Sequence, residues 1–211
     1  MLKLTEIFFS LQGETSRVGL PTIFIRLTGC PLRCQYCDTA YAFSGGKNYS
    51  IDEILKQISQ YKTKYVTVTG GEPLAQKACL HLLKKLCDKN YSVSLETSGA
   101  VDIAGVDSRV VKILDIKTPA SNEASRNIFD NLKYIFPSDE IKFVICNRED
   151  YDWSKKIISE YNLLERCAIL FSPSYLQIAN ETLAHWILED NLPVRFQIQL
   201  HKMIWGDARS R

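Results

Sequence analysis

Short runs of β-branched and aromatic residues alternate with amphipathic stretches from about residue 22 to the end of the chain. Each run is short, largely apolar and bounded by turn-forming residues, which is the pattern of strands buried in a sheet. This pattern predicts strands at residues 22–27, 65–69, 92–96, 113–117, 141–145 and 168–171.

The stretches between these runs have the spacing of amphipathic helices. Ser50 and Glu53 have capping-box spacing at the start of residues 51–61. Asn90 follows the next helical stretch, where a left-handed residue can end a helix. Further helices are predicted near residues 123–135, 150–161 and 180–189. Strands that alternate with helices imply a parallel sheet with right-handed crossovers, in either an open doubly wound sheet or a barrel.

The unusual residues of the chain favour one of these architectures. The clustered cysteines follow the first strand, Gly70–Pro73 the second and Thr97–Gly99 the third, Lys117 ends the fourth, and Ser172–Tyr175 follows the sixth. In a closed or partly closed β/α barrel, the carboxyl ends of the strands share one mouth, where active sites are built. A complete eight-fold barrel takes about 250 residues. Since this chain has 211 residues, we expect an α/β fold with a partial β/α barrel, in a single domain over residues 1–211.

The composition narrows the classes of function. A hydrophobic fraction of 45% and a charged fraction of 24% are those of an ordinary globular protein. The net charge of +2 is spread along the chain without a basic tract, which argues against a nucleic-acid surface. No apolar run approaches the roughly 20 residues of a membrane span, and residues 1–7 lack the order of a signal peptide. We therefore expect a cytoplasmic protein with no direct nucleic-acid or membrane partner.

Three of the seven cysteines lie close together in the sequence. Cys30, Cys34 and Cys37 put three thiolates on one loop, whereas a structural zinc site needs four protein ligands. A four-iron cluster held by three thiolates leaves one iron open to a small molecule. The other cysteines fall in apolar patterns and are expected to be small buried side chains, namely Cys79, Cys87, Cys146 and Cys167. One of these, or His81 or His185, remains an alternative fourth ligand of a zinc site.

The cysteine spacing, with Tyr36 before the last cysteine, resembles the signature of the radical S-adenosylmethionine (SAM) superfamily. Residues 69–73, TGGEP, resemble the second element of that superfamily. Alone, this segment predicts only a turn. Its glycines allow a close backbone approach, and Glu72 offers a carboxylate suited to an ammonium group. The resemblance implies one 4Fe-4S cluster whose open iron chelates the amino and carboxylate groups of SAM, and a 5′-deoxyadenosyl radical formed by reductive cleavage of the sulfonium.

Longer segments are similar to one family of that superfamily, the 7-carboxy-7-deazaguanine synthases. The similarity covers residues 8–39, 114–119, 139–145 and 192–206, and so extends over nearly the whole chain. It implies conversion of 6-carboxy-5,6,7,8-tetrahydropterin to 7-carboxy-7-deazaguanine with loss of ammonia, on the route to queuosine and other 7-deazapurines. The mechanism that the resemblance implies removes the C6 hydrogen of the substrate and contracts the ring of the substrate radical, and it assigns no protein acid or base. The resemblance also implies a Mg²⁺ requirement, a homodimer, and a flavodoxin or ferredoxin-type electron donor.

Two polar patterns agree with an anionic substrate in the barrel mouth. Arg26 interrupts an apolar strand on the face of Phe24 and Thr28, where a charge is costly unless it is paired. A substrate carboxylate is a suitable partner because a guanidinium can donate two parallel hydrogen bonds to it. The alternative is an ion pair with a Glu or Asp of the chain. Residues 195–201 alternate polar and apolar side chains with the period of a half-buried strand, and the resemblance puts His201 at the substrate.

The resemblance also assigns the remaining site residues. Substrate contacts are implied for Gln12, Gly13, Arg26, Thr69, His201 and the carbonyl of Leu11. SAM contacts are implied for Tyr36, Asp38, Gly71, Glu72, Ser98, Asp115, Ile116, Lys117, Ser172, Pro173, Ser174 and Tyr175. The implied metal ligands are Cys30, Cys34 and Cys37 for the cluster and Thr39 for Mg²⁺. Because a neutral hydroxyl is a weak ligand, Mg²⁺ is expected to bind strongly only together with oxygens of the substrate.

Two other functions share part of this pattern. An activase that abstracts hydrogen from a glycine of a partner protein shares the cysteine spacing, but it does not predict Arg26, Thr39 and residues 199–202 together. A zinc-stabilised binding domain without catalysis predicts bound zinc in place of iron. Members of the resembled family commonly end soon after the segment that matches His201, whereas this chain continues. Residues 207–211 are therefore expected to be a disordered tail without an assigned role.

Overall fold

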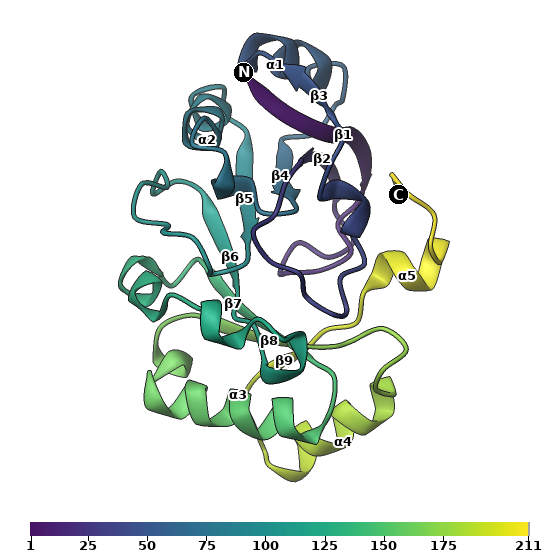
Figure 1. The fold of residues 1–211 in the computed structure, drawn as a ribbon, viewed down its shortest axis with the longest axis vertical. Helices are drawn as coiled ribbons and strands as arrows, with labels where there is room; N and C mark the ends of the chain where they lie inside the picture. Colours follow the sequence, from purple (N-terminus) through teal and green to yellow (C-terminus); the bar gives the residue numbers. More distant parts are fainter. Residues whose placement is uncertain (211) are drawn as a thin grey trace.

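The computed structural model describes residues 1–210, which fold around one mixed sheet of nine strands (Figure 1). The strands are β1 (Leu2–Leu11), β2 (Pro21–Leu27), β3 (Lys47–Tyr49), β4 (Tyr65–Gly70), β5 (Ser92–Thr97), β6 (Val111–Asp115), β7 (Glu140–Ile145), β8 (Ala168–Pro173) and β9 (Arg195–Phe196). Their order across the sheet is β3-β1-β2-β4-β5-β6-β7-β8-β9. From β2 onward neighbouring strands are parallel, while β1 is antiparallel to β2 and β3. The predicted α/β fold is confirmed as an incomplete barrel, with β3 and β9 at the edges of the described sheet.

Helices lie along the outside of the sheet, from α1 at the top of Figure 1 through α2 to α3 and α4 at the bottom. Their bounds are α1 (Ile51–Ile58), α2 (Cys79–Asp88), α3 (Arg148–Glu160), α4 (Asn180–Glu189) and α5 (Leu200–Trp205). The predicted capping box is confirmed, because the Ser50 hydroxyl accepts from the Glu53 N–H at 3.2 Å and the Glu53 carboxylate accepts from the Ser50 N–H at 2.7 Å. Asn90 takes a left-handed φ of 62° immediately after α2, as its position predicted.

The predicted strands are present as β2 and β4–β8, although β6 begins and ends two residues earlier than predicted. The antiparallel strands β1 and β3 were not predicted. In β1 the pairing with β2 shifts register between Leu4 and Glu6, which interrupts the two-residue alternation that identifies a strand. In β3 only three residues pair, and they carry no apolar run.

The helix predicted over residues 123–135 is only partly correct. The segment forms two short 3₁₀ helices, Ala124–Arg126 and Phe129–Tyr134. Between the two helices, the Asn127 side chain donates to the Lys117 carbonyl at 2.8 Å. Within the second helix, the Asn131 side chain donates to the Val101 carbonyl at 2.9 Å. These side chains bind backbone of neighbouring loops, which competes with a continuous helix.

The strand predicted over residues 195–201 is wrong beyond Phe196. The side chain of Gln197 accepts a hydrogen bond from the Thr15 N–H at 2.6 Å and donates to the Thr15 carbonyl at 2.9 Å. This contact turns the chain away from the sheet, and helix α5 begins three residues later at Leu200. His201 therefore lies on a helix and not on a strand.

The core lies between the sheet and the helices. Ile23 and Ile25 of β2 and Val66 and Val68 of β4 are fully buried in one cluster with Leu82 of α2. The amino-terminal ends of β6 and β7 carry a buried ion pair, in which Lys112 Nζ lies 2.8 Å from Asp139 Oδ2. Both side chains are at most 2% exposed.

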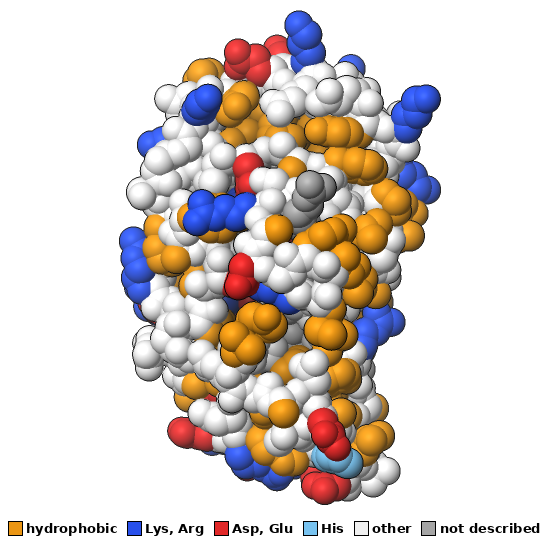
Figure 2. All heavy atoms as spheres, turned by 90° about the vertical axis from the view of Figure 1, so that its right-hand side faces the viewer, with side chains coloured by type: hydrophobic (Ala, Val, Ile, Leu, Met, Phe, Trp, Pro, Cys, Tyr) orange, Lys and Arg blue, Asp and Glu red, His pale blue; other side chains and the backbone are white. Residues whose placement is uncertain are grey.

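The charged side chains are scattered over the surface, as their distribution along the sequence predicted. On the face shown in Figure 2, Lys and Arg side chains are isolated from one another and hydrophobic side chains form a broad band among them. Within residues 1–210, no helix combines the length and the apolar character needed to cross a membrane. Residues 207–210 make defined contacts, including a hydrogen bond of 2.6 Å from the Ser210 hydroxyl to Glu6, while Arg211 lies outside the described residues.

Replacing Asp139 with Ala measures how strongly the buried ion pair stabilises the fold. Asp139 also accepts from the N–H groups of Lys112 and Phe136, each at 2.8 Å, so D139A leaves a buried cation, one buried donor and one partly buried donor without this partner. We expect the free energy of unfolding in urea to fall by about 3–5 kcal/mol. In the control Asp130→Ala, which removes only an exposed pair with Lys133, the urea midpoint should not change. Equal effects of the two variants would contradict this expectation.

Candidate active site

One cavity of about 250 Å³ opens at the carboxyl ends of the parallel strands. Thr69 at the end of β4, Asp115 at the end of β6 and Ser172 in β8 all line it. The other predicted residues that line it are Leu11, Gln12, Gly13, Arg26, Cys30, Cys34, Tyr36, Cys37, Asp38, Thr39, Gly71, Ser98, Lys117, Pro173, Ser174, Tyr175 and His201. Only Glu72 and Ile116 of the predicted site residues do not. The position of the cavity follows from the parallel sheet, since parallel strands bring their carboxyl ends to one edge.

The three clustered cysteines lie on the loop after β2, and each is a free thiol that is partly exposed to the cavity. Burial raises the pKa of Cys34 to about 11 and also raises the pKa of Cys30 and Cys37. A metal centre would have to displace these protons, because the thiolate is the ligand. The donor set fits a cluster held by three thiolates.

The zinc alternative needs a fourth ligand beside these thiols. Among residues 1–210, no three His, Cys, Asp or Glu side chains lie close enough together to hold one metal ion. His81 and His185 are exposed on α2 and α4, and His185 lies 3.5 Å from Glu181. Cys79, Cys87 and Cys146 are buried as predicted, whereas Cys167 is partly exposed.

The Gly70–Gly71 turn packs directly on the cysteine loop. A Cβ atom on Gly71 would lie 2.4 Å from the Gly29 carbonyl oxygen and 2.8 Å from Cys30 Cβ. The Glu72 N–H donates to the same Gly29 carbonyl at 2.8 Å. Gly71 is therefore required by the close approach of two backbones, and the turn and the cysteine loop form one surface.

The Glu72 side chain, expected to meet an ammonium group, is fully buried instead. Oε1 accepts from the Leu74 N–H and from the Thr97 hydroxyl, both at 2.9 Å. Oε2 accepts from the N–H and the hydroxyl of Ser98, at 2.7 and 2.6 Å. With four donors around it, this carboxylate joins the ends of β4 and β5 and lies outside the cavity lining. Ile116 is likewise buried, and its N–H already donates to the Lys142 carbonyl at 2.9 Å.

Two buried polar atoms on the cavity wall have no hydrogen-bond partner within the described residues, the Tyr36 hydroxyl and Asp115 Oδ1. The other Asp115 oxygen lies 3.0 Å from Lys117 Nζ. Burial alone would lower the pKa of Lys117, but Asp115 and Tyr36 raise it well above its usual value, so the lysine is charged. Buried polar groups are rarely left unpaired. These two atoms are thus available to a polar ligand in the cavity.

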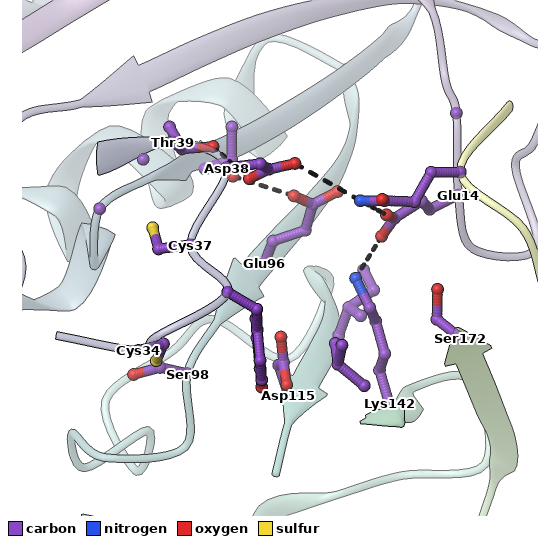
Figure 3. A pocket seen from close by; sticks show the side chains of 18 of the residues that line it. Glu14, Cys34, Cys37, Asp38, Thr39, Glu96, Ser98, Asp115, Lys142 and Ser172 are labelled. Carbon is purple, nitrogen blue, oxygen red and sulfur yellow. Dashed lines mark hydrogen bonds and ion pairs between the residues drawn. The ribbon is translucent and has the colours of Figure 1, made fainter. Parts of the chain in front are cut away.

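The cavity is also lined by three charged residues that the sequence analysis missed, Glu14, Glu96 and Lys142. Glu14 forms an ion pair with Lys142 of β7, and Gln199 donates to the second Glu14 oxygen at 3.0 Å. Figure 3 shows Glu14, Lys142, Glu96 and Asp38 directed toward one another from separate elements. Lys142 had the same signal as Arg26, a charge inside an apolar strand, and could have been found from it.

The carboxyl groups of this cluster differ in how readily they hold a proton. Burial raises the pKa of Glu96, and the nearby Glu14 raises it further. For Glu14 the burial effect is outweighed by Lys142, which lowers the pKa below its ordinary value. Glu96 Oε2 accepts from the Thr69 hydroxyl at 2.9 Å and Oε1 from the Gln12 amide at 3.4 Å. Glu96 thereby orients two of the predicted substrate-binding side chains.

Arg26 in β2 and His201 in α5, which are far apart in the sequence, both line the cavity. Arg26 Nε lies 2.7 Å from Glu6 Oε1, so the alternative of an ion pair within the chain is realised through one nitrogen. His201 reaches the loop after β1, where a Cβ atom on Gly13 would lie 2.3 Å from His201 Nδ1. Burial lowers the pKa of His201, which favours the neutral imidazole.

Comparison with known proteins identifies relatives of this chain. Residues 24–116 match the sequence model of the Radical SAM superfamily. The 7-carboxy-7-deazaguanine synthase of Chlorobaculum tepidum is 43% identical over 99% of this chain and 96% of its own length. The synthase of Koribacter versatilis is 41% identical over 97% of both chains. The crystal structure of QueE from Escherichia coli, at 23% identity, matches with a TM-score of 0.78 over 95% of this chain and 94% of that one, and so has the same fold.

Substituting Gly71 by Ala tests the packing of the turn on the cysteine loop. The added methyl group has no space beside the Gly29 carbonyl, so it should push the loop out of place. We expect reconstituted G71A to bind less than half of the iron that the unchanged protein binds, by iron assay and visible absorbance. Gly105→Ala is the control, because its Cβ would meet only the end of the Leu80 side chain, at 3.0 Å. Full iron content in G71A would contradict the close packing.

Proposed function

Since this chain belongs to the 7-carboxy-7-deazaguanine synthases, a family of radical SAM carbon–nitrogen lyases, we propose that its cavity converts 6-carboxy-5,6,7,8-tetrahydropterin to 7-carboxy-7-deazaguanine with loss of ammonia. Membership of the family implies a 4Fe-4S cluster and SAM. The proposal for the cavity rests on one observation, that three free thiols, Arg26, Thr39 and His201 line the same space.

The part of the cavity near the cysteines is suited to the cluster and SAM. Cys30, Cys34 and Cys37 would hold the cluster, and Tyr36 and Asp115 would pair their free polar atoms with SAM. Ser98 lies beside Cys34 in Figure 3, whereas Ser172 lies farther from the cysteines, and Ser172–Tyr175 line the cavity at the end of β8. The chemistry supplied by the bound cluster and SAM is reductive cleavage of the sulfonium and abstraction of a hydrogen atom from the substrate. The protein's own part is to hold both reactants and exclude water.

The opposite part of the cavity is suited to the pterin. Arg26 would grip the substrate carboxylate, which matches the bidentate geometry that guanidinium prefers. Gln12, Thr69 and His201 supply neutral donors and acceptors that suit the edges of a pterin ring. Leu11 and Gly13 border the same space through the loop after β1.

Thr39 is the proposed Mg²⁺ ligand. Its hydroxyl donates to Asp38 Oδ1 at 2.8 Å, which leaves the hydroxyl oxygen free to accept a cation. The Thr39 hydroxyl and the nearby Lys142 lower the pKa of Asp38 below its ordinary value, so the carboxylate is charged. One hydroxyl beside one carboxylate is a weak magnesium site, so carboxylate and carbonyl oxygens of the substrate would complete it. The ion would orient the substrate and stabilise charge on its oxygens.

We further propose that the protein acts in the cytoplasm as a homodimer and receives electrons from a flavodoxin or ferredoxin-type donor. The hydrophobic band in Figure 2 supports association between copies of the chain, since large exposed apolar patches mark interaction sites.

The proposed reaction is tested by product analysis. The reconstituted protein, supplied with SAM, a reductant, Mg²⁺ and 6-carboxy-5,6,7,8-tetrahydropterin under anaerobic conditions, should release 7-carboxy-7-deazaguanine and ammonia, detected by mass spectrometry. C34A should lose both cluster iron and product, because one of the three thiolates is missing. If the brown, iron-loaded protein cleaves SAM but forms no deazaguanine, the proposed substrate is wrong.

The role of Thr39 is tested through the magnesium dependence. T39A should keep its cluster but need about 10-fold more Mg²⁺ for half-maximal activity, in the range seen when a metal site loses a supporting group. Thr63→Ala is the matched control, because Thr63 bonds the Pro21 carbonyl at 2.8 Å outside the cavity. An unchanged Mg²⁺ titration of T39A would remove Thr39 from the metal site.

A further inference from the structure

Glu6 faces Arg26 across the antiparallel pair of β1 and β2. The two residues are opposite each other in the register, but only because β1 contains an extra residue between Leu4 and Glu6. Without this bulge, the alternation of β1 would turn Glu6 to the same side as Leu2 and Leu4, which are buried in the core. Bulges re-aim side chains in this way and are common beside active sites. The bulge thus brings a carboxylate to the cavity side of the strand.

The guanidinium of Arg26 uses only one nitrogen for this contact. Nε donates to Glu6 Oε1 at 2.7 Å, and the two terminal nitrogens have no hydrogen-bond partner among residues 1–210. The guanidinium carbon lies 5.7 Å from the centre of the Phe8 ring and 5.9 Å from that of Tyr41. Arg26 lines the cavity and Glu6 does not. The terminal nitrogens are therefore the part of the guanidinium available to a ligand.

The Glu6 carboxylate is itself held from other directions. The Tyr41 hydroxyl donates to Oε1 at 2.8 Å, and the Ser210 hydroxyl donates to Oε2 at 2.6 Å. Although burial alone would raise the pKa of Glu6, the donors Ser210, Tyr41 and Arg26 lower it, so the carboxylate stays ionised. A carboxylate with three donors around it is a fixed support for the Arg26 side chain.

We propose that Glu6 is a positioning residue, which fixes the guanidinium of Arg26 so that its two terminal nitrogens grip the carboxylate of the substrate. This inference rests on the proposed function, because it takes a carboxylated pterin as the ligand. An arginine has five N–H donors in a rigid fork, and Glu6 engages the single Nε donor while leaving the terminal edge whole. Glu6 also compensates the charge of Arg26 before substrate arrives, which a half-buried cation needs.

An orienting role and a purely electrostatic role of Glu6 predict opposite effects of its removal on the binding of a carboxylate. If Glu6 acted only as a charge, its loss would remove an anion that repels the substrate carboxylate, and carboxylate binding would strengthen. If it orients Arg26, its loss frees the guanidinium and carboxylate binding weakens. Glu6→Gln separates the two, because its amide oxygen can still accept from Nε while the charge is gone.

The test uses the reconstituted protein with its cluster, SAM and Mg²⁺, and titrates two fluorescent ligands, 6-carboxypterin and unsubstituted pterin. The measured quantity is the preference for 6-carboxypterin, as the ratio of the two Kd values. We expect Glu6→Ala to lower this preference about 10-fold, in line with the loss of one charge-assisted hydrogen-bonded contact. Glu6→Gln should keep it within about 3-fold, and binding of unsubstituted pterin should be unchanged in both. Glu181→Ala, whose side chain is 87% exposed on α4, is the control and should match the unchanged protein.

Other outcomes overturn the inference. An unchanged or increased preference in Glu6→Ala shows that Glu6 does not orient Arg26, and an equal loss for both pterins shows a merely structural role. Arg26→Ala is measured beside them, and a full preference in that variant also overturns the inference. Product formation by the unchanged protein is followed separately. Its absence would refute the proposed function, whereas product formed with an unaltered preference in Glu6→Ala would refute this inference alone.

Discussion

The cavity depends on the close contact between the Gly70–Gly71 backbone and the end of β2. A Cβ atom at either glycine would lie 2.4 Å from a carbonyl oxygen, that of Leu27 or of Gly29. Two backbones this close leave no freedom for the cysteine loop to drift from the turn after β4. Glu72 extends the same junction to β5 through Thr97 and Ser98, so three neighbouring strand ends form one rigid wall. Backbone packing against that wall therefore fixes the start of the cysteine loop at Gly29 and Cys30.

A second constraint is the balance of charge inside the cavity. Among the described residues, three cations line it and each has a carboxylate partner, in the pairs Arg26–Glu6, Lys117–Asp115 and Lys142–Glu14. An isolated buried charge would be costly, whereas paired charges can be retained in the absence of a ligand. The pairing is incomplete in hydrogen bonds, since Asp115 Oδ1 has no partner among the described residues. Charge is thus balanced within these three pairs, while Asp38 and Glu96 add carboxyl groups that form no ion pair within the described residues.

The wall that holds the cysteines was largely predictable from the sequence, because the cysteines and the Gly70–Pro73 turn are adjacent to strands whose parallel order follows from alternation. The Glu6–Arg26 pair was not, because the bulge in β1 hides the strand and reverses the side that Glu6 faces. His201 was placed in the cavity through resemblance, but on the wrong element, since alternation in residues 195–201 cannot reveal that Gln197 binds Thr15. The burial of Glu72 could not be predicted either, because its residue type suits a ligand while the four donors around it come from Leu74, Thr97 and Ser98.

The contacts missed at the two ends of the chain share a physical cause. The parts that sequence reasoning found are built from residues that lie near one another along the chain and at the ends of parallel strands. The missed contacts join the first and last segments, such as Gln199 with Glu14, Leu200 with the Gly13 carbonyl, and Ser210 with Glu6. Such contacts cost loop-closure entropy and form only once the sheet has brought the ends together. The part of the cavity lined by Gly13, Gln199 and His201 therefore requires contacts between the two ends of the chain, whereas the junction of the cysteine loop with the turn after β4 involves only the neighbouring strands β2, β4 and β5.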